Sequence, residues 1–151
     1  IIASRKPIWE FETAMKATLQ PGVSLTRQIV VDRPRTIEFM GEDGRVYGTP
    51  YMILDIEETC RLLIVQHADP GEDSVGIEVN VKHLAATLPN MTVEITVKVT
   101  SVEGRKVAFE IHAKDDLDTI STGSHSRFVI DKAKTFERLK AKAAKWQALK
   151  K

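Results

Sequence analysis

Glu57 is an acidic residue whose neighbours suggest chemistry in this 151-residue chain. On a helix, Ile53, Cys60 and Ile64 would lie on one side of it and Arg61 on the other. The four-residue spacing to Arg61 favours an ion pair at a half-exposed edge, which is the simpler interpretation. In the other interpretation, the carboxylate lies in an apolar cleft, where poor solvation makes it a base or a nucleophile.

His83 is a second candidate for proton chemistry. It follows apolar residues at every second position, so we expect its imidazole at the end of a row that faces the core. This row consists of Val75, Ile77, Val79 and Val81. A histidine in such a place is either a hydrogen-bonded core residue or a group that exchanges protons near neutral pH, and the pattern leaves both roles open.

Other polar residues lie near the ends of predicted elements. Thr49 precedes Pro50 and an apolar run, a position that favours a role as helix N-cap. His125 and Arg127 share a face of the last predicted strand, whereas His112 alternates with charged residues on a solvated face. The sequence contains no paired cysteines and no HExxH, P-loop or GxGxxG motif, so we expect neither a metal nor another cofactor.

The helix that would position Glu57 follows from hydrophobic spacing. Residues 49–67 are mostly apolar and are followed by Asp69-Pro70-Gly71, so we predict a helix of roughly 18 residues. Its apolar residues form one face and occupy much of another, which indicates a largely enclosed helix. The first face carries Met52, Ile53, Ile56, Cys60, Leu63 and Ile64, and the second carries Tyr51, Leu54, Leu62 and Val65.

Strands account for most of the remaining chain. Alternating apolar residues predict strands at 25–31, 75–83, 93–99 and 107–113, a last strand that ends near residue 130, and a short extended piece at 36–40. The links after residue 83 have hairpin length, which implies an antiparallel sheet. The predicted fold class is α+β, with an antiparallel sheet curled around one enclosed helix.

Two extensions flank this predicted domain. Ile8, Phe11, Met15 and Leu19 have helical spacing, which predicts a short amphipathic helix at the N-terminus. Residues 131–151 carry eight basic and two acidic residues, and apolar residues recur there at three- and four-residue steps. We therefore divide the chain into an N-terminal extension (1–22), a central domain (23–131) and a basic amphipathic C-terminal helix (132–151) that packs through Phe136 and Trp146.

Composition fits one soluble domain with a real core, with 42% hydrophobic and 28% charged residues. The net charge of +1 combines an acidic body, −5 over residues 1–130, with a basic tail of +6. No apolar run approaches the roughly 20 residues of a membrane span. The first twenty residues lack the apolar stretch of a signal peptide, and Cys60 is the single cysteine, so we expect a cytoplasmic location.

Two segments resemble a known family. They are HLAATLPNMTVEITVKVTSVEGRK, from His83 to Lys106, and DDLDTISTGSHSRFVI, from Asp115 to Ile130. Both resemble the hotdog-fold acyl-CoA thioesterases, and the closest likeness is to the fluoroacetyl-CoA thioesterase group. The resemblance extends from about Leu25 to Lys134 and implies a hotdog fold that assembles as a homodimer or a higher homo-oligomer.

The resemblance also implies a set of site residues. By position, the family's catalytic threonine, glutamate and histidine correspond to Thr49, Glu57 and His83, eight and then 26 residues apart. Its substrate-contacting glycine corresponds to Gly76, and its CoA-contacting arginine corresponds to Arg127. The resemblance therefore favours the catalytic interpretations of these residues over the structural ones.

Two positions depart from the family pattern. The fluoroacetate enzyme has a phenylalanine that gates the acyl pocket shortly before its threonine, whereas residues 41–48 here read GEDGRVYG. We therefore do not expect selectivity for fluoroacetate. Asn90 stands where the family usually has glycine, which suits a position with positive φ.

The activity implied by the resemblance is hydrolysis of a short or small acyl-CoA thioester to the free acid and CoA. Glu57 would attack the thioester or activate water, His83 would handle protons and polarise Thr49, and the Gly76 N–H would help to hold the carbonyl oxygen. Eight helical residues rise about 12 Å, so Thr49 and Glu57 cannot touch, and in hotdog proteins the reacting group lies at a dimer interface.

Other functions stay open at this point. The chain could bind acyl-CoA without turnover, or act as a hotdog dehydratase or hydratase on a related thioester. The basic tail is a candidate for screening the 3′-phosphate of CoA. A nucleic-acid role for the tail has no aromatic-basic surface motif to support it, and we expect no membrane partner.

Overall fold

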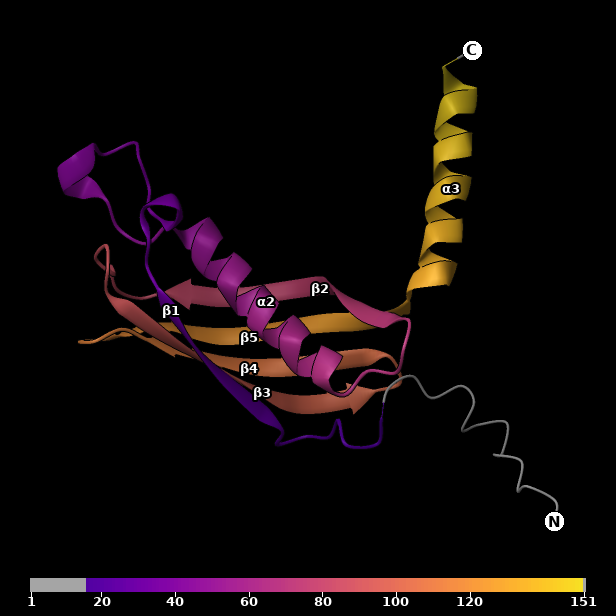
Figure 1. Cartoon of the computed structure of the whole chain (residues 1–151), viewed down its shortest axis with the longest axis horizontal. Coiled ribbons are helices and arrows are strands. Elements are labelled where there is room, and N and C mark those ends of the chain that lie inside the picture. Colours follow the sequence, from indigo (N-terminus) through magenta and orange to yellow (C-terminus); the bar gives the residue numbers. More distant parts are fainter. Residues whose placement is uncertain (1–15, 151) are drawn as a thin grey trace.

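The computed structural model describes residues 16–150 as an antiparallel sheet, a long helix lying across it, and a second long helix that projects from it (Figure 1). The strands are β1 (Ser24–Val30), β2 (Glu72–His83), β3 (Thr92–Glu103), β4 (Lys106–Lys114) and β5 (Thr119–Asp131). The helices are α2 (Thr49–Gln66) and α3 (Lys132–Leu149). The predicted α+β class, with an antiparallel sheet wrapped around a central helix and a C-terminal helix, is confirmed.

The order of strands in the sheet is β1-β3-β4-β5-β2, and every neighbouring pair is antiparallel. Strand β2 therefore lies at one edge and pairs only with β5 inside the sheet. The register places Gly76 opposite Arg127 and His83 opposite Ser121, with an irregularity between Gly76 and Glu78. This register brings residues of β2 and β5 that are far apart in sequence to the same edge.

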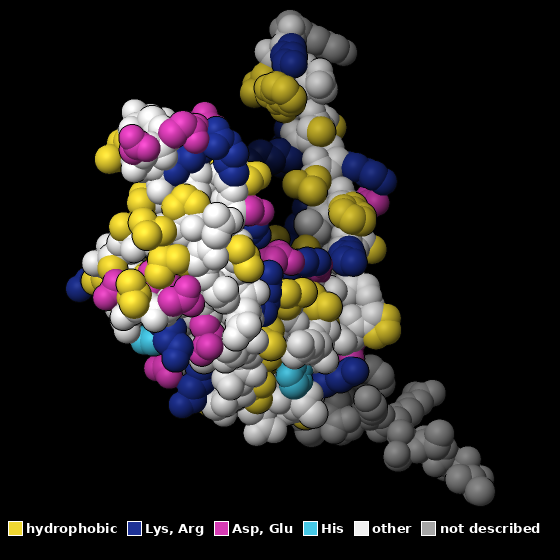
Figure 2. All heavy atoms as spheres, turned by 60° about the vertical axis from the view of Figure 1, so that its left-hand side comes forward, with side chains coloured by type: hydrophobic (Ala, Val, Ile, Leu, Met, Phe, Trp, Pro, Cys, Tyr) yellow, Lys and Arg dark blue, Asp and Glu magenta, His cyan; other side chains and the backbone are white. Residues whose placement is uncertain are grey.

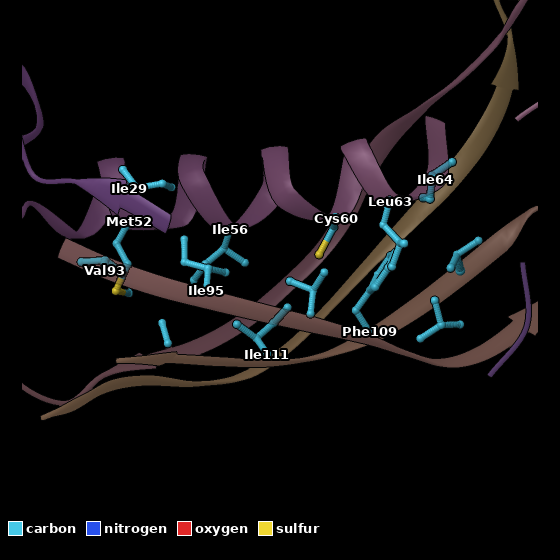
Figure 3. Packing of buried hydrophobic residues seen from close by; sticks show 14 of the residues in the cluster. Ile29, Met52, Ile56, Cys60, Leu63, Ile64, Val93, Ile95, Phe109 and Ile111 are labelled. Atoms are coloured by element: carbon cyan, nitrogen blue, oxygen red, sulfur yellow. The ribbon is translucent and has the colours of Figure 1, made fainter. Parts of the chain in front are cut away.

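Helix α2 packs one face on the sheet, as the spacing of its apolar residues predicted. Met52, Ile56, Cys60, Leu63 and Ile64 are buried against strand residues such as Ile95 and Phe109 (Figure 3). The helix ends at Gln66, and Gly71 in the following turn has a φ of +85° that a side chain would strain. Because α2 packs on the sheet in this way, the position of Glu57 along the sheet and the direction in which it leaves the helix are fixed.

Two local predictions have different outcomes. Asn90 has a φ of 73°, so the expectation of positive φ at this position is confirmed. The extended piece predicted at 36–40 is wrong as a strand, because within it only Thr36 forms a bridge, to Tyr47. Phe39 and Met40 are exposed, and the segment lies between two short 3-10 turns at Arg33–Arg35 and Glu42–Gly44.

The second apolar face of α2 is not enclosed within one chain. Tyr51, Leu54 and Val65 are exposed, so the prediction of a largely enclosed helix is wrong for this face. The row Val75, Ile77 and Val79 was predicted to face the core, and it is exposed as well. The reason is that β2 is an edge strand whose central residues are exposed on both faces.

Helix α3 follows β5 without a break and leaves the body of the protein (Figure 1). Phe136 and Trp146 are 56% and 57% exposed, so the expected packing through these two residues is wrong. Figure 2 shows α3 standing apart, with hydrophobic and basic side chains along it.

The amphipathic helix predicted near the N-terminus falls mainly on residues 1–15, which lie outside the described residues. Within residues 16–150, no helix is long and apolar enough to cross a membrane.

Candidate active site

Thr49 and His83 meet at one end of the sheet. Thr49 is the first residue of α2, but the N-cap is Gly48 and the Thr49 side chain does not cap the helix, so the predicted capping role is wrong. Its Oγ1 atom lies 2.8 Å from Nδ1 of His83, the last residue of β2. The Thr49 side chain therefore forms its hydrogen bond with His83 and not with the backbone of the helix.

The environment of His83 favours its neutral form. The ring is half-buried, and burial lowers the pKa of His83 below its usual value. Its Nε2 atom is buried without a hydrogen-bond partner among the described residues. The edge of the Tyr47 ring packs against the imidazole, with centroids 6.4 Å apart and planes at 81°. A neutral imidazole with an unused nitrogen can accept a proton.

Tyr47 is itself held in place by a buried polar network. Its hydroxyl donates to the buried carboxylate of Asp55, which also receives two hydrogen bonds from Arg35 at 2.9 and 3.2 Å. Burial and the hydrogen bond to Asp55 raise the pKa of Tyr47, so the phenol stays neutral. This network fixes the wall against which His83 packs.

A groove opens beside the Thr49–His83 pair. It has a volume of about 490 Å³, and its lining includes Thr49, Pro50, His83 and the apolar residues Ile37 and Phe39. Residues of three segments form it, namely the loop before α2, the start of α2 and the chain that leaves β2. Its mixture of polar and apolar lining suits a small acyl group attached to a polar arm.

Glu57 lies in a second cluster, further along α2. The ion pair predicted between Glu57 and Arg61 is wrong, because Arg61 donates instead to Asp73 at 2.9 and 2.8 Å and to Glu58 at 3.0 Å. The Glu57 carboxylate points towards Gly76 on β2. A methyl group built at Gly76 would lie 3.1 Å from Glu57 Oε1. The absence of a side chain at position 76 therefore keeps space open beside the carboxylate.

His125 and Arg127, from β5, complete the second cluster. They are 1% and 5% exposed, and Arg127 Nη1 lies 3.2 Å from His125 Nε2. The same methyl group at Gly76 would lie 3.2 Å from His125 Cε1 and 3.5 Å from Arg127 Nη1. Burial, together with the charge of Arg127, lowers the pKa of His125, so the ring stays neutral. His125 was not among the predicted site residues, although its shared face with Arg127 was a signal.

Arg127 is oriented towards the interior. It donates to Ser74 Oγ at 2.7 Å and to the Ser74 carbonyl oxygen at 2.8 Å, and its remaining Nη contacts His125. Burial lowers the pKa of Arg127, and the charge of Glu57 acts in the opposite direction. Within one chain the guanidinium is 5% exposed and lies near the Glu57 carboxylate, on the same side of Gly76.

The predicted residues thus form two groups in one chain. Thr49 and His83 meet at one end of β2, whereas Glu57, Gly76 and Arg127 gather near the other end with His125. No cluster of potential metal ligands occurs among residues 16–150. Cys60 is buried, and burial raises the pKa of its thiol to about 12, which leaves it unsuited to act as a nucleophile.

A family model and a related protein assign the chain to the same family. Residues 31–133 match the family of fluoroacetyl-CoA-specific thioesterases, a match that ends at the start of α3. The fluoroacetyl-CoA thioesterase of Streptantibioticus cattleyicolor is 33% identical over 123 residues, which cover 77% of this chain and 88% of that protein.

Solved structures agree with this match. A structure of the fluoroacetyl-CoA thioesterase has a TM-score of 0.76 and 30% identity, covering 82% of this chain and 97% of that one. A thioesterase-superfamily member from Thermus thermophilus has a TM-score of 0.77 and 28% identity, covering 85% and 96%. The chain therefore belongs to the fluoroacetyl-CoA-specific thioesterase family of hotdog-fold proteins.

Proposed function

We propose that this chain is a thioester hydrolase that converts a small acyl-CoA to the free acid and CoA. The observation that carries the proposal is the hydrogen bond between Thr49 and His83 at the mouth of an acyl-sized groove. Family membership gives the reaction class, and the name of the Streptantibioticus relative suggests a short acyl group. Fluoroacetate itself is not proposed as the substrate.

In the proposed reaction, Glu57 supplies the nucleophile. Its carboxylate either attacks the thioester carbon or takes a proton from a water molecule whose oxygen attacks that carbon. In both routes the carbon–sulfur bond breaks, and the CoA thiolate leaves and takes up a proton from water. In the covalent route a water molecule then hydrolyses the anhydride formed between Glu57 and the acyl group, which releases the free acid and restores the carboxylate. The space beside Gly76 supports this role, because no side chain there blocks access to the carboxylate.

Thr49 and His83 would act on the carbonyl oxygen. His83 Nδ1–H donates to Thr49 Oγ1 in this scheme, which leaves the Thr49 hydroxyl proton free to donate to the thioester oxygen. The unused Nε2 of His83 can exchange a proton during the reaction. The Gly76 N–H is a further donor for the developing oxyanion, as the family resemblance suggests.

A second copy of the chain completes the site in this proposal. Eight helical residues separate Thr49 from Glu57, about 12 Å along α2, so one thioester cannot reach both within one chain. The unpaired edge of β2 carries exposed Val75, Ile77 and Val79, which is the surface that an added strand would cover. We infer a homodimer in which β2 pairs with β2 of the partner.

The register of such a pair brings the two groups together. Two-fold symmetry makes β2 antiparallel to its copy. If the axis lies between Val79 and Asn80, Gly76 of one chain falls opposite His83 of the partner subunit. The carboxylate of Glu57 would then face the Thr49–His83 pair of the other chain, and the dimer would hold two equivalent sites.

The cellular location follows from the chemistry rather than from a targeting signal. The single Cys60 is a free, buried thiol, which fits a reducing compartment. We propose the cytoplasm as the place where the protein meets its acyl-CoA substrate.

A thiol-release assay tests the proposed function. The wild type is compared with Glu57→Gln and His83→Ala on a panel of acyl-CoA thioesters of increasing length. Glu58→Gln and His112→Ala are matched controls, because Glu58 pairs with Arg61 and His112 is exposed on the sheet. We expect thiol release by the wild type and both controls, and its loss in the two site variants.

The assay also separates the alternatives. Hydrolysis that survives both site substitutions contradicts the residue assignment. Binding of acyl-CoA with no thiol release on any member of the panel favours a binding module instead. Hydration or dehydration of an enoyl- or 3-hydroxyacyl-CoA, without thiol release, indicates a hotdog hydratase or dehydratase.

A further inference from the structure

A small basic hollow lies where α3 leaves the sheet. It has a volume of about 180 Å³ and is formed by the end of β5, the turn between β3 and β4, and the first turns of α3. Its cationic lining consists of Arg105, Lys134 and Arg138, and Phe128 and Asp131 also line it. Lys134 and Arg138 lie beyond residue 133, where the family match ends.

Within the described part of the chain, two of the three cations of this hollow have no acidic partner, whereas Arg105 pairs with Glu72. Among residues 16–150, neither Lys134 nor Arg138 forms an ion pair through its side chain. Lys134 and Arg138 are four residues apart on one helix, a spacing at which like charges repel each other. Arg105 lies 4.0 Å from Glu72 and donates to the Val129 carbonyl oxygen at 3.3 Å. A bound polyanion would relieve the repulsion.

Asp131 does not neutralise the hollow. Its carboxylate accepts the backbone N–H of Lys134 at 3.0 Å and so caps α3. With Asp131 and Glu72, the partner of Arg105, three cations face two carboxylates, so the surroundings of the hollow stay net positive. The hollow therefore selects an anion with more than one negative charge.

Phe128 adds an aromatic surface to the same hollow. Its side chain is 39% exposed, although it neighbours the buried Arg127 on β5. An exposed aromatic ring beside guanidinium and ammonium groups is suited to a nucleotide, whose base stacks on the ring while its phosphates pair with the cations.

The hollow is also near the proposed reaction site. Arg127 contacts the Glu57 cluster, and Asp131 at the hollow is four strand residues away, about 13 Å. The pantetheine arm of CoA separates its thioester from its nucleotide, so the two ends of one substrate must bind at separate places. Arg127 is 5% exposed and directs three of its N–H groups to Ser74 and His125, so it offers little surface to a phosphate within one chain.

We propose that Arg105, Lys134 and Arg138, with Phe128, bind the phosphorylated adenosine end of the CoA substrate. This inference rests on the proposed function for the identity of the ligand. The inference gives α3 a role in binding. Lys134 and Arg138 belong to α3 and lie beyond the residues that match the family.

Calorimetric titration with adenosine 3′,5′-bisphosphate tests the site without any turnover. The wild type is compared with the double variant Lys134→Gln/Arg138→Gln and with Lys142→Gln/Lys145→Gln, a control that removes two positive charges further along the same helix. We expect the first double variant to bind at least about tenfold more weakly and the control to bind nearly as the wild type. Equal loss in both variants would show general charge attraction and overturn the proposal.

Two further titrations define the ligand. Inorganic phosphate that binds as tightly as the bisphosphate would overturn a nucleotide site, because the base would then contribute nothing. Phe128→Ala should weaken binding of the bisphosphate and leave binding of inorganic phosphate unchanged. Unchanged binding of the bisphosphate by Phe128→Ala contradicts the stacking role.

Kinetics separate this inference from the proposed function. Lys134→Gln/Arg138→Gln should raise KM for an acyl-CoA about tenfold and leave kcat unchanged. The same variant should hydrolyse the corresponding N-acetylcysteamine thioester, which has no nucleotide, at the wild-type rate. Hydrolysis of both substrates with unchanged KM overturns the nucleotide site alone, whereas absence of hydrolysis in the wild type overturns the proposed function and leaves the calorimetric result to decide the site.

Discussion

Replacement of Gly76 by alanine should lower activity without lowering stability. The structure gives the size of the change. The new methyl group would lie 3.1 Å from Glu57 Oε1, where ordinary van der Waals contact begins at 3.4 Å. His125, which would be 3.2 Å away, is held by a hydrogen bond to the Glu78 carbonyl oxygen and by stacking on Phe109. The flexible end of Glu57 must therefore move, by about 0.3–0.5 Å.

That displacement sets the expected loss. A misplacement of about 1 Å in a reacting group can cost roughly a hundredfold in rate, so a shift of a few tenths of an ångström should cost several-fold to about tenfold in kcat/KM. Stability should change in the opposite direction. Gly76 lies in a strand and does not need positive φ, so alanine restricts the unfolded chain and should stabilise the fold by about 0.5 kcal/mol.

Two measurements check this prediction. Thiol release on the best acyl-CoA gives kcat/KM, and urea unfolding followed by circular dichroism gives the free energy of unfolding. Lys98→Ala, an exposed change on β3, is the control and should leave kcat/KM unchanged. Wild-type kcat/KM in Gly76→Ala would refute the placement of the reacting group beside Gly76. A clear loss of stability would refute the steric reasoning, because the inactivation would then reflect a damaged fold.

The buried polar groups and the exposed strand edge lead to four further predictions. Burial lowers the pKa of His83 and His125, so the unfolded chain binds more protons than the folded one below about pH 6.5; the free energy of unfolding should fall as the pH drops through that region, and a flat profile between pH 7 and 5 contradicts it. Activity that requires neutral His83 should fall in the same direction, and His83→Ala should remove that limb from the pH profile of any residual rate. Asp55→Asn leaves Arg35 without its buried carboxylate and should destabilise the fold by about 2–3 kcal/mol in urea unfolding, whereas a change below about 0.5 kcal/mol would show that the network is dispensable. Ile77→Asp puts a charge on the exposed row of β2 and should convert the proposed dimer to a monomer in size-exclusion chromatography with light scattering; a dimer mass that the substitution leaves unchanged would contradict an interface at β2.

Local patterns in the sequence were sufficient to predict most of the helices and strands. Apolar spacing predicted α2 to within about one residue, because the helix buries a single stripe and the stop at Asp69-Pro70-Gly71 is strong. Alternation predicted the strands as well, and in β3 and β4 the alternating apolar residues face the core. The prediction of an extended piece at 36–40 was wrong, because a short extended segment becomes a strand only if a neighbouring strand forms backbone hydrogen bonds with it.

The exposure of apolar rows could not be predicted from their spacing. Val75, Ile77 and Val79 have the same period as a core-facing row, but the order of the strands places β2 at the edge. A pattern shows that a surface is apolar and not which molecule covers it. The same limit explains Phe136 and Trp146 on α3, whose spacing predicted contact with the body and whose side chains are exposed.

In the candidate site, tertiary contacts decide which hydrogen-bond partner a side chain takes. Spacing favoured an ion pair between Glu57 and Arg61, but Asp73 at the start of β2 offers Arg61 a bidentate contact that no local pattern contains. Thr49 likewise forms its hydrogen bond with a residue 34 positions away. The role of His125 depends on the same kind of long-range contact, through the register of β2 with β5.

Co-expression of two inactive chains shows whether Glu57 of one subunit works with Thr49 and His83 of the partner subunit. Glu57→Gln and His83→Ala, carrying different tags, are purified separately and then as a mixed dimer isolated through both tags. In the mixed dimer one site combines the intact Glu57 of one chain with the intact His83 of the other, so we predict about half of the wild-type kcat per dimer, against almost none for either variant alone. A mixed dimer as inactive as its two parents would rule out a shared site, because it would mean that each site takes all three residues from one chain.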